Sequence, residues 1–90
     1  MIYLIENVEN NTTKIGWSKH PYERLGQLQT ANCHVLRLVK VYDNIDRVKE
    51  RYLHRALWQY RCRFNSEWFR LNGGQLIDIC DELLNHCFKK

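Results

Sequence analysis

The chain has little of what would interrupt a compact fold or carry it into a membrane. One proline and four glycines in 90 residues exclude a collagen-like or low-complexity chain, and 44% apolar residues are enough for a core. No apolar run approaches the ~18 residues of a membrane-spanning helix. The segment Met1–Ile5 lacks the basic leader and the length of a signal peptide. We therefore expect a cytoplasmic protein without membrane contact.

The cysteines also lack a recognisable pattern. None of the four is spaced as CxxC, so in a reducing compartment we expect them to remain thiols. The adjacent pairs Cys33-His34 and His86-Cys87 raise the question of a zinc site. Zinc ligands are usually two to four residues apart, and this spacing disfavours a zinc site here.

The positive charge is concentrated in one stretch of the chain. The net charge is +4, and between positions 47 and 63 the only acid is Glu50. The basic residues of that stretch are Arg47, Lys49, Arg51, Arg55, Arg61 and Arg63. Such a patch favours contact with nucleic acid, although a solvated helix face would have the same composition.

The first third of the chain predicts a β-hairpin followed by a helix. Apolar segments at Met1–Ile5 and Lys14–Ser18 flank a polar, Asn-rich tip at Asn7–Thr13. A helix from about His20 to Ala31 follows, with Ser18 as its expected N-cap.

The middle of the chain predicts a third strand and an amphipathic helix. Val35–Tyr42 is rich in β-branched residues, and Asp43 and Asn44 are expected to end this strand and cap the next helix. Apolar residues then recur at helical spacing over Ile45–Tyr60, which predicts four helical turns.

The C-terminal part predicts a short extended segment, Glu67–Leu71, a turn at Asn72–Gly74 and a packing helix within residues 72–90. A chain this short builds one core, so residues 1–90 form a single domain. The order of two strands, a helix, a strand, a helix, a short strand and a helix predicts an α+β fold, in which helices pack against a small antiparallel sheet.

An ordered set of short motifs resembles the GIY-YIG nuclease superfamily. The resemblance is closest to its compact phage and bacterial branch, in which KIG replaces YIG, and E-x-x-x-H and EWF follow. It covers about residues 2–71, and the matching pieces are Ile2-Tyr3, Lys14-Ile15-Gly16, Arg24, Glu50 and Glu67-Trp68-Phe69. The chain departs from the wider superfamily at Met1, where GIY has Gly, and at Leu28, where many relatives have His.

The resemblance implies a three-stranded antiparallel sheet flanked by helices, and metal-dependent cleavage of phosphodiesters at one active site. Tyr3 would orient or activate the nucleophile, Arg24 would bind the phosphate, and Glu50 would bind Mg²⁺ or Mn²⁺. Lys14 stands at the second motif's Tyr, and His54 would orient Glu50 or protonate a leaving oxygen.

Elementary chemistry permits these roles. A phenol is a poor base at a pKa of ~10, so Tyr3 needs a nearby cation, which Lys14 on the paired strand could supply. The alternatives remain open: Tyr3 could simply pack on the sheet, and Glu50 could form an intrahelical salt bridge to Arg47 or His54.

Other residues have less specific patterns. Glu67 could be a second acid near the site or a salt-bridge partner of Arg70 or Arg63, and the salt bridge is the favoured interpretation. The aromatic residues Trp17, Trp58, Trp68 and Phe69 are typical of a core rather than of base stacking, and at least two of the three Trp are expected to be structural. The residues expected to contact nucleic acid are Arg47, Arg51, Arg55, Arg61, Arg63 and Asn65.

The sequence thus predicts a metal-dependent endonuclease with little sequence specificity, acting on nucleic acid, with DNA as the expected form. The alternative is an inactive module of the same fold that binds nucleic acid or a protein and acts as a regulator or inhibitor. A homo-oligomer or a protein partner is compatible with both interpretations.

Overall fold

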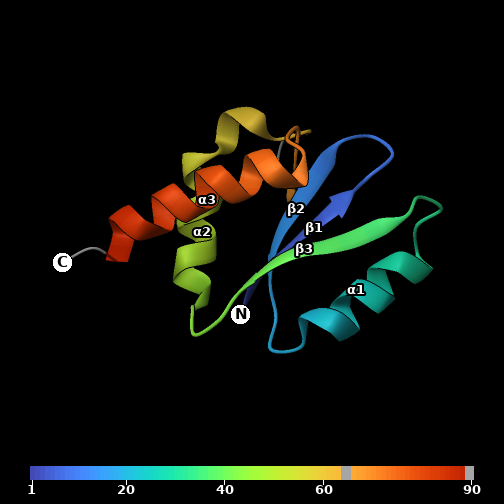
Figure 1. Cartoon of the computed structure of the whole chain (residues 1–90), viewed down its shortest axis with the longest axis horizontal. Coiled ribbons are helices and arrows are strands. Elements are labelled where there is room, and N and C mark those ends of the chain that lie inside the picture. Colours follow the sequence, from blue (N-terminus) through green and yellow to red (C-terminus); the bar gives the residue numbers. More distant parts are fainter. Residues whose placement is uncertain (64–65, 89–90) are drawn as a thin grey trace.

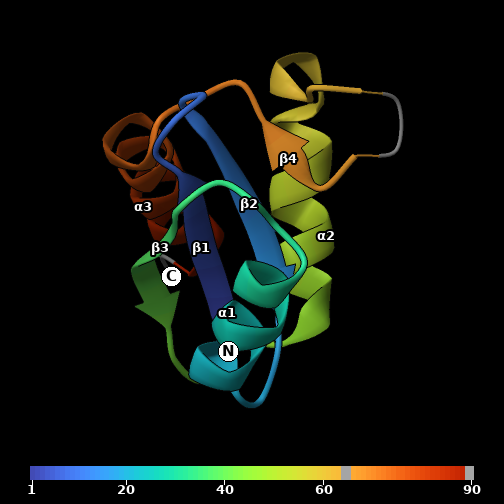
Figure 2. The same cartoon turned by 90° about the vertical axis from the view of Figure 1, so that its right-hand side faces the viewer.

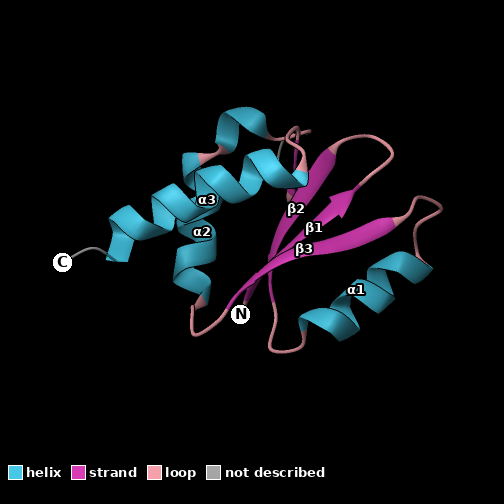
Figure 3. Ribbon diagram, viewed as in Figure 1, coloured by secondary structure: helices cyan, strands magenta, loops and turns pink. Residues whose placement is uncertain are grey.

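The computed structural model describes residues 1–63 and 66–88 and contains one antiparallel sheet with helices on both sides (Figures 1 and 3). The elements are β1 (Ile2–Asn7), β2 (Thr12–Trp17), α1 (Pro21–Thr30), β3 (Leu36–Tyr42), α2 (Arg47–Ala56), the short 3-10 helix η1 (Trp58–Tyr60), β4 (Trp68–Phe69) and α3 (Gly73–Phe88). The strand order is β3-β1-β2-β4. The predicted α+β fold is confirmed, with four strands instead of three because Trp68 and Phe69 pair with β2.

Each face of the sheet has its own apolar core. Ile2 and Leu4 of β1 pack with α2 and α3, whereas Tyr3 and Ile5 pack on the other face with α1 and Leu36. Figure 2 shows α1 on one side of the strands and α2 and α3 on the other. This alternation follows from the two-residue period of a strand, which turns successive side chains to opposite faces.

The first two helices begin later than the sequence predicts. The residue that precedes α1 is His20, and the Ser18 hydroxyl accepts a hydrogen bond from the His20 amide in the turn before the helix. Asp46, rather than Asp43 or Asn44, caps α2 by accepting from the Lys49 amide. Asn44 has a positive φ of 55°, which places it in the connecting turn.

Helix α2 is also shorter than expected, because it ends at Ala56 and gives way to η1. In the described ranges, no helix is long and apolar enough to cross a membrane.

A reciprocal capping arrangement starts α3. The Asn72 side chain accepts from the Gln75 amide at 2.8 Å, and the Gln75 side chain accepts from the Asn72 amide at 3.1 Å. This is the geometry of a capping box. The buried Glu6 carboxylate accepts from the Gly73 amide at 2.8 Å and so ties β1 to the same helix end.

The aromatic residues divide into buried and exposed ones. Phe69 is fully buried, and Trp17 and Trp68 pack partly against the two cores, as expected. The expectation that at least two of the three Trp are structural is therefore confirmed, and Trp58 is the exception, with 69% of its surface exposed. It follows the end of α2, where the turn of η1 directs it away from the core.

Candidate functional site

The main candidate site is a pocket at the edge of β2. Strand β4 pairs only with Thr13 and Lys14, and the last backbone hydrogen bond beyond them joins the Ile15 amide to the Glu67 carbonyl at 3.2 Å. The edge of β2 is therefore open beside Gly16. The pocket there has a volume of about 420 Å³ and is lined by Tyr3, Gly16, Trp17, Ser18, Lys19, Arg24, Arg47, Glu50, Arg51 and Glu67.

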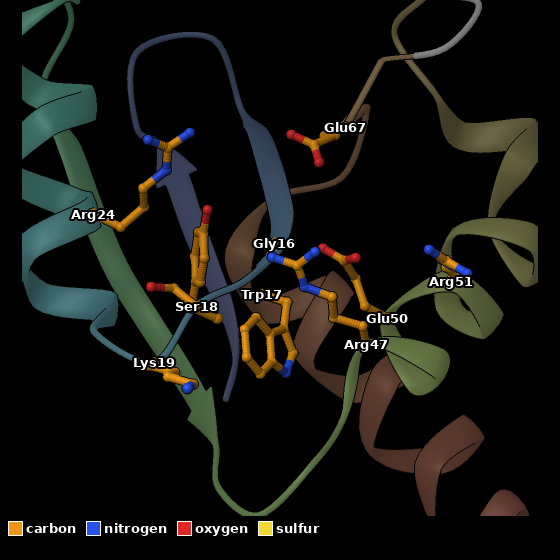
Figure 4. A pocket seen from close by; sticks show the side chains of 10 residues that line it. Gly16, Trp17, Ser18, Lys19, Arg24, Arg47, Glu50, Arg51 and Glu67 are labelled. Carbon is orange, nitrogen blue, oxygen red and sulfur yellow. The ribbon is translucent and has the colours of Figure 1, made fainter.

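Residues from both faces of the sheet meet in this pocket. Figure 4 shows Arg24 reaching in from α1 on one side, Glu50 lying on the α2 side, and Glu67 on the segment before β4. Tyr3, Arg24 and Glu50 line the same pocket, as the resemblance implies. They meet because the edge of β2 is open beside Gly16, so that Glu50 on α2 can line the same pocket as residues on the α1 side of the sheet.

Gly16 is required for the position of Tyr3. The two residues are paired across β1 and β2, and a Cβ on Gly16 would overlap the tip of the Tyr3 ring more closely than real Cβ atoms approach other atoms. The ring therefore occupies the space that a side chain at position 16 would take. An isolated glycine in a strand often marks such a close approach, and here the neighbour is a side chain.

Tyr3 is protonated at neutral pH in this environment. Burial raises the pKa of its phenol above the ordinary value, and the Glu67 and Glu50 carboxylates raise it further. The Arg24 guanidinium opposes this shift and lowers the pKa. The phenol is thus a hydrogen-bonding group placed between an arginine and two carboxylates.

Lys14 has a different partner from the one expected. Its ammonium is buried and forms an ion pair with Glu67, which is half exposed. The cation that lowers the pKa of Tyr3 is Arg24. The expected pairing of Glu67 with Arg70 or Arg63 is also wrong, because β4 brings Glu67 beside the strand that carries Lys14.

Glu50, His54 and Glu67 form a cluster of potential metal ligands. One ligand atom from each lies within 4.8 Å of the others, and Glu50 and His54 are partly buried. Glu50 and His54 share a face of α2 because they are four residues apart. The sequence left open that Glu67 is a second acid near the site but favoured a salt bridge, and the structure places Glu67 in the cluster.

The tautomer of His54 follows from its hydrogen bond. Its Nε2 lies 3.0 Å from the carbonyl oxygen of Ile15. A carbonyl oxygen can only accept, so Nε2 carries the hydrogen and Nδ1 of the neutral ring has the free lone pair. A histidine that ligates a metal commonly donates its other N–H in this way, so the ring is oriented as a ligand would be.

Two contacts hold the start of α2 against β2. The Trp17 indole donates to the Ile45 carbonyl at 2.8 Å, and the Arg47 guanidinium lies 4.9 Å from the centre of the Trp17 ring. Arg47 is thus engaged with Trp17 and forms no salt bridge with Glu50. The alternative of an intrahelical salt bridge from Glu50 to Arg47 or His54 is not realised among the described residues.

The predicted basic residues border a connected series of hollows. Arg51 lines the main pocket and also a second hollow, which Arg55 and Arg61 line as well. Arg63 lines further hollows beside it. Asn65, the remaining predicted contact, lies outside the described residues.

Comparison with known proteins gives one family. The family model of the T5orf172 domain matches residues 1–84, which is nearly the whole chain. No curated protein and no solved structure matches it. The matched region includes every described residue of the pocket.

Proposed function

The chain belongs to the T5orf172 domain family, a phage-associated domain of the endonuclease type, and from this premise we propose that it is a metal-dependent endonuclease of the GIY-YIG kind. The substrate would be DNA, cleaved with little sequence specificity. The observation that carries the proposal is the meeting of Tyr3, Arg24 and Glu50 in one pocket.

The donor set fits a divalent cation. Two carboxylates and an imidazole each have one potential ligand atom, and these atoms lie within 4.8 Å of one another. Oxygen ligands suit Mg²⁺, and Mn²⁺ also accepts imidazole. Glu50 and Glu67 would hold the ion, with His54 as a third ligand. A bound divalent cation would supply positive charge beside the phosphate and lower the pKa of a water molecule.

Arg24 is suited to hold the scissile phosphate. It lies on the side of the pocket opposite Glu50, and its guanidinium is exposed (Figure 4). A planar guanidinium can bind two phosphate oxygens at once and stabilise the charge that develops during attack. A phosphate between Arg24 and the carboxylate cluster would lie within reach of the Tyr3 phenol.

Tyr3 would orient the attacking water. Its phenol can accept a hydrogen bond from that water while it remains protonated, and the raised pKa favours this form. If Glu50 and Glu67 held a divalent cation, its charge would offset the effect of these two carboxylates on the pKa of Tyr3. The water oxygen then bonds to phosphorus as the bond from phosphorus to the leaving sugar oxygen breaks. The proton of the attacking water would pass to solvent, and the leaving sugar oxygen would take a proton from solvent, because Tyr3 stays protonated and the Nε2–H of His54 is held by the Ile15 carbonyl.

Lys14 would act as a positioning residue. Its ion pair fixes Glu67 beside β2 and partly neutralises that carboxylate. Since the pair uses one carboxylate oxygen of Glu67, the second oxygen stays available as a ligand. This differs from the role that the resemblance implied for position 14.

The test is a cleavage panel with Mg²⁺, Mn²⁺ and EDTA on single-stranded, duplex and branched DNA and on RNA. We expect metal-dependent products from the wild type and at least about 100-fold slower cleavage by Glu50→Gln, because the principal metal ligand is lost. The control is Glu23→Gln, which removes an exposed α1 carboxylate outside the pocket. Thermal melts check that both variants fold.

Two outcomes would contradict the proposal. One is a wild type that cleaves none of the substrates with either metal. The other is a Glu50→Gln variant as active as Glu23→Gln. Binding that is equal with and without EDTA, in the wild type and in Glu50→Gln and without products, would support the inactive binding module instead.

A further inference from the structure

An exposed tryptophan lies beside three arginines at the far end of α2. Trp58 is 69% exposed, and it lines a hollow of about 440 Å³ with Gln59, Arg61, Cys62, Arg63 and Arg70. Within the described residues, no acidic side chain lines this hollow. An exposed indole beside several guanidinium groups suits an aromatic ligand that carries negative charge.

The backbone around this hollow is well connected. Arg61 forms a β-bridge with Phe69, and the Cys62 amide donates to the Trp68 carbonyl at 3.0 Å. The Arg70 guanidinium donates to the Cys62 carbonyl at 3.1 Å. These bonds fix the arginines relative to η1, so the hollow exists before any ligand binds.

One arginine has unused hydrogen-bonding capacity. The Nε atom of Arg61 is buried and has no hydrogen-bond partner among the described atoms. A buried donor without a partner costs free energy. A phosphate in the hollow would bind Arg61 through the terminal guanidinium nitrogens, since the buried Nε is out of its reach.

The hollow is continuous with the proposed cleavage site. Arg61 lines both this hollow and the neighbouring one, and that neighbour shares Glu50, Arg51 and Glu67 with the main pocket. From Glu50 to Ala56 the helical rise amounts to roughly 9 Å, and Trp58 lies two residues beyond the end of α2. At ~3.4 Å per stacked nucleotide, this separation corresponds to a few nucleotides.

We propose that Trp58 stacks on an unpaired base of the substrate, a few nucleotides from the cleaved bond, while Arg61, Arg63 and Arg70 bind the adjoining phosphates. This inference rests on the proposed nuclease function and narrows its substrate. In a duplex the base faces are covered by neighbouring bases, so the stacked base belongs to a single-stranded segment. The preferred substrate then carries an overhang, gap or branch next to the cleavage position.

The first experiment measures the affinity of a fluorescein-labelled single-stranded oligonucleotide in EDTA, where no cleavage occurs. We expect Trp58→Ala to weaken binding by between about 5-fold and 150-fold, the usual effect of losing one base–aromatic stack. Trp58→Phe should retain most of the affinity. The matched control is Tyr22→Ala, which removes another exposed aromatic residue, 76% exposed on α1 and outside these hollows.

The second experiment places a single abasic nucleotide at each position of the oligonucleotide in turn. With the wild-type protein, an abasic nucleotide at one position should weaken binding of the oligonucleotide by a similar factor. With Trp58→Ala, an abasic nucleotide at that same position should not weaken binding. This coupling identifies stacking, because a structural role of Trp58 would weaken all oligonucleotides equally.

The outcomes separate this inference from the proposed function. If the wild type cleaves DNA but Trp58→Ala binds as tightly as Tyr22→Ala, only the stacking site is wrong. If Trp58→Ala changes the sedimentation of the protein and leaves oligonucleotide affinity intact, the exposed indole serves self-association and the inference fails. A wild type that neither binds nor cleaves any oligonucleotide overturns both proposals.

Discussion

The smallest feature on which the pocket depends is the missing side chain of Gly16. The Tyr3 ring lies where a Cβ at that position would stand, and Tyr3 lines the pocket with Arg24 and Glu50. A methyl group on Gly16 would push the ring away, and with it the phenol that we propose orients the water. Gly26 on α1 is the opposite case, since a Cβ there meets no atom within 4 Å.

At this scale we predict that Gly16→Ala destabilises the protein by about 1–3 kcal/mol, the usual cost of overpacking. In a Tyr3→Ala background, Gly16→Ala should lower the free energy of unfolding by at least about 1 kcal/mol less than it does in the wild type, because the overlapping ring is gone. Urea unfolding of the four proteins of this cycle measures the coupling.

Gly26→Ala is the control, and it should stabilise the protein by about 0.5–1 kcal/mol, since alanine favours a helix interior. A Gly16→Ala variant that stabilises the protein as Gly26→Ala does would show that the Tyr3 ring lies elsewhere.

Among the secondary-structure elements, α2 carries the site on one side and packs on the other. Leu53 is fully buried in the core beneath the sheet, whereas Glu50 and His54 face the hollows. The Asp46 cap and the indole of Trp17 determine where the helix starts and how it lies on β2. The position of the proposed metal ligands therefore depends on the packing of this helix.

We predict that Leu53→Ala lowers the free energy of unfolding by about 2–5 kcal/mol, because it leaves a cavity under α2. Val48→Ala removes a side chain that is 63% exposed on the same helix, and it should change stability by no more than about 0.5 kcal/mol. Chemical denaturation followed by circular dichroism measures both values. Equal effects of the two substitutions would show that α2 does not pack through Leu53.

For the whole molecule, the distribution of charge matters more than its net value of +4. Arg51 and Arg55 border the hollows beside the cluster of potential metal ligands. Arg37 lies on β3 and forms an ion pair with Glu6 at 2.8 Å, away from that surface. Arg51 and Arg55 thus place positive charge beside the proposed site.

We predict that duplex DNA binding in EDTA weakens linearly with the logarithm of salt concentration. Arg51→Gln and Arg55→Gln should each reduce the magnitude of that slope by about 0.9, the value for one lost phosphate contact. Arg37→Gln removes the same charge and should leave the slope unchanged. Identical slopes for all three variants would mean that net charge, rather than this surface, attracts the DNA.

The local patterns of the sequence already determined most of the elements. The apolar segments around the polar tip, the β-branched residues of Val35–Tyr42 and the helical spacing over Ile45–Tyr60 are local patterns, and such patterns predicted the hairpin, the third strand and three helices. The motif order also brought Tyr3 and Glu50 into one proposed site. Helix starts were less predictable, because several polar residues competed for each cap.

The tertiary structure alone decided which side chains meet. Lys14 and Glu67 are 53 positions apart, and only the pairing of β4 with β2 joins them and brings Glu67 to Glu50 and His54. Likewise, the exposure of Trp58 depends on where α2 ends. Hydrophobic periodicity is a local property of a chain, whereas the partner of a charge is determined by long-range strand pairing, which no local pattern contains.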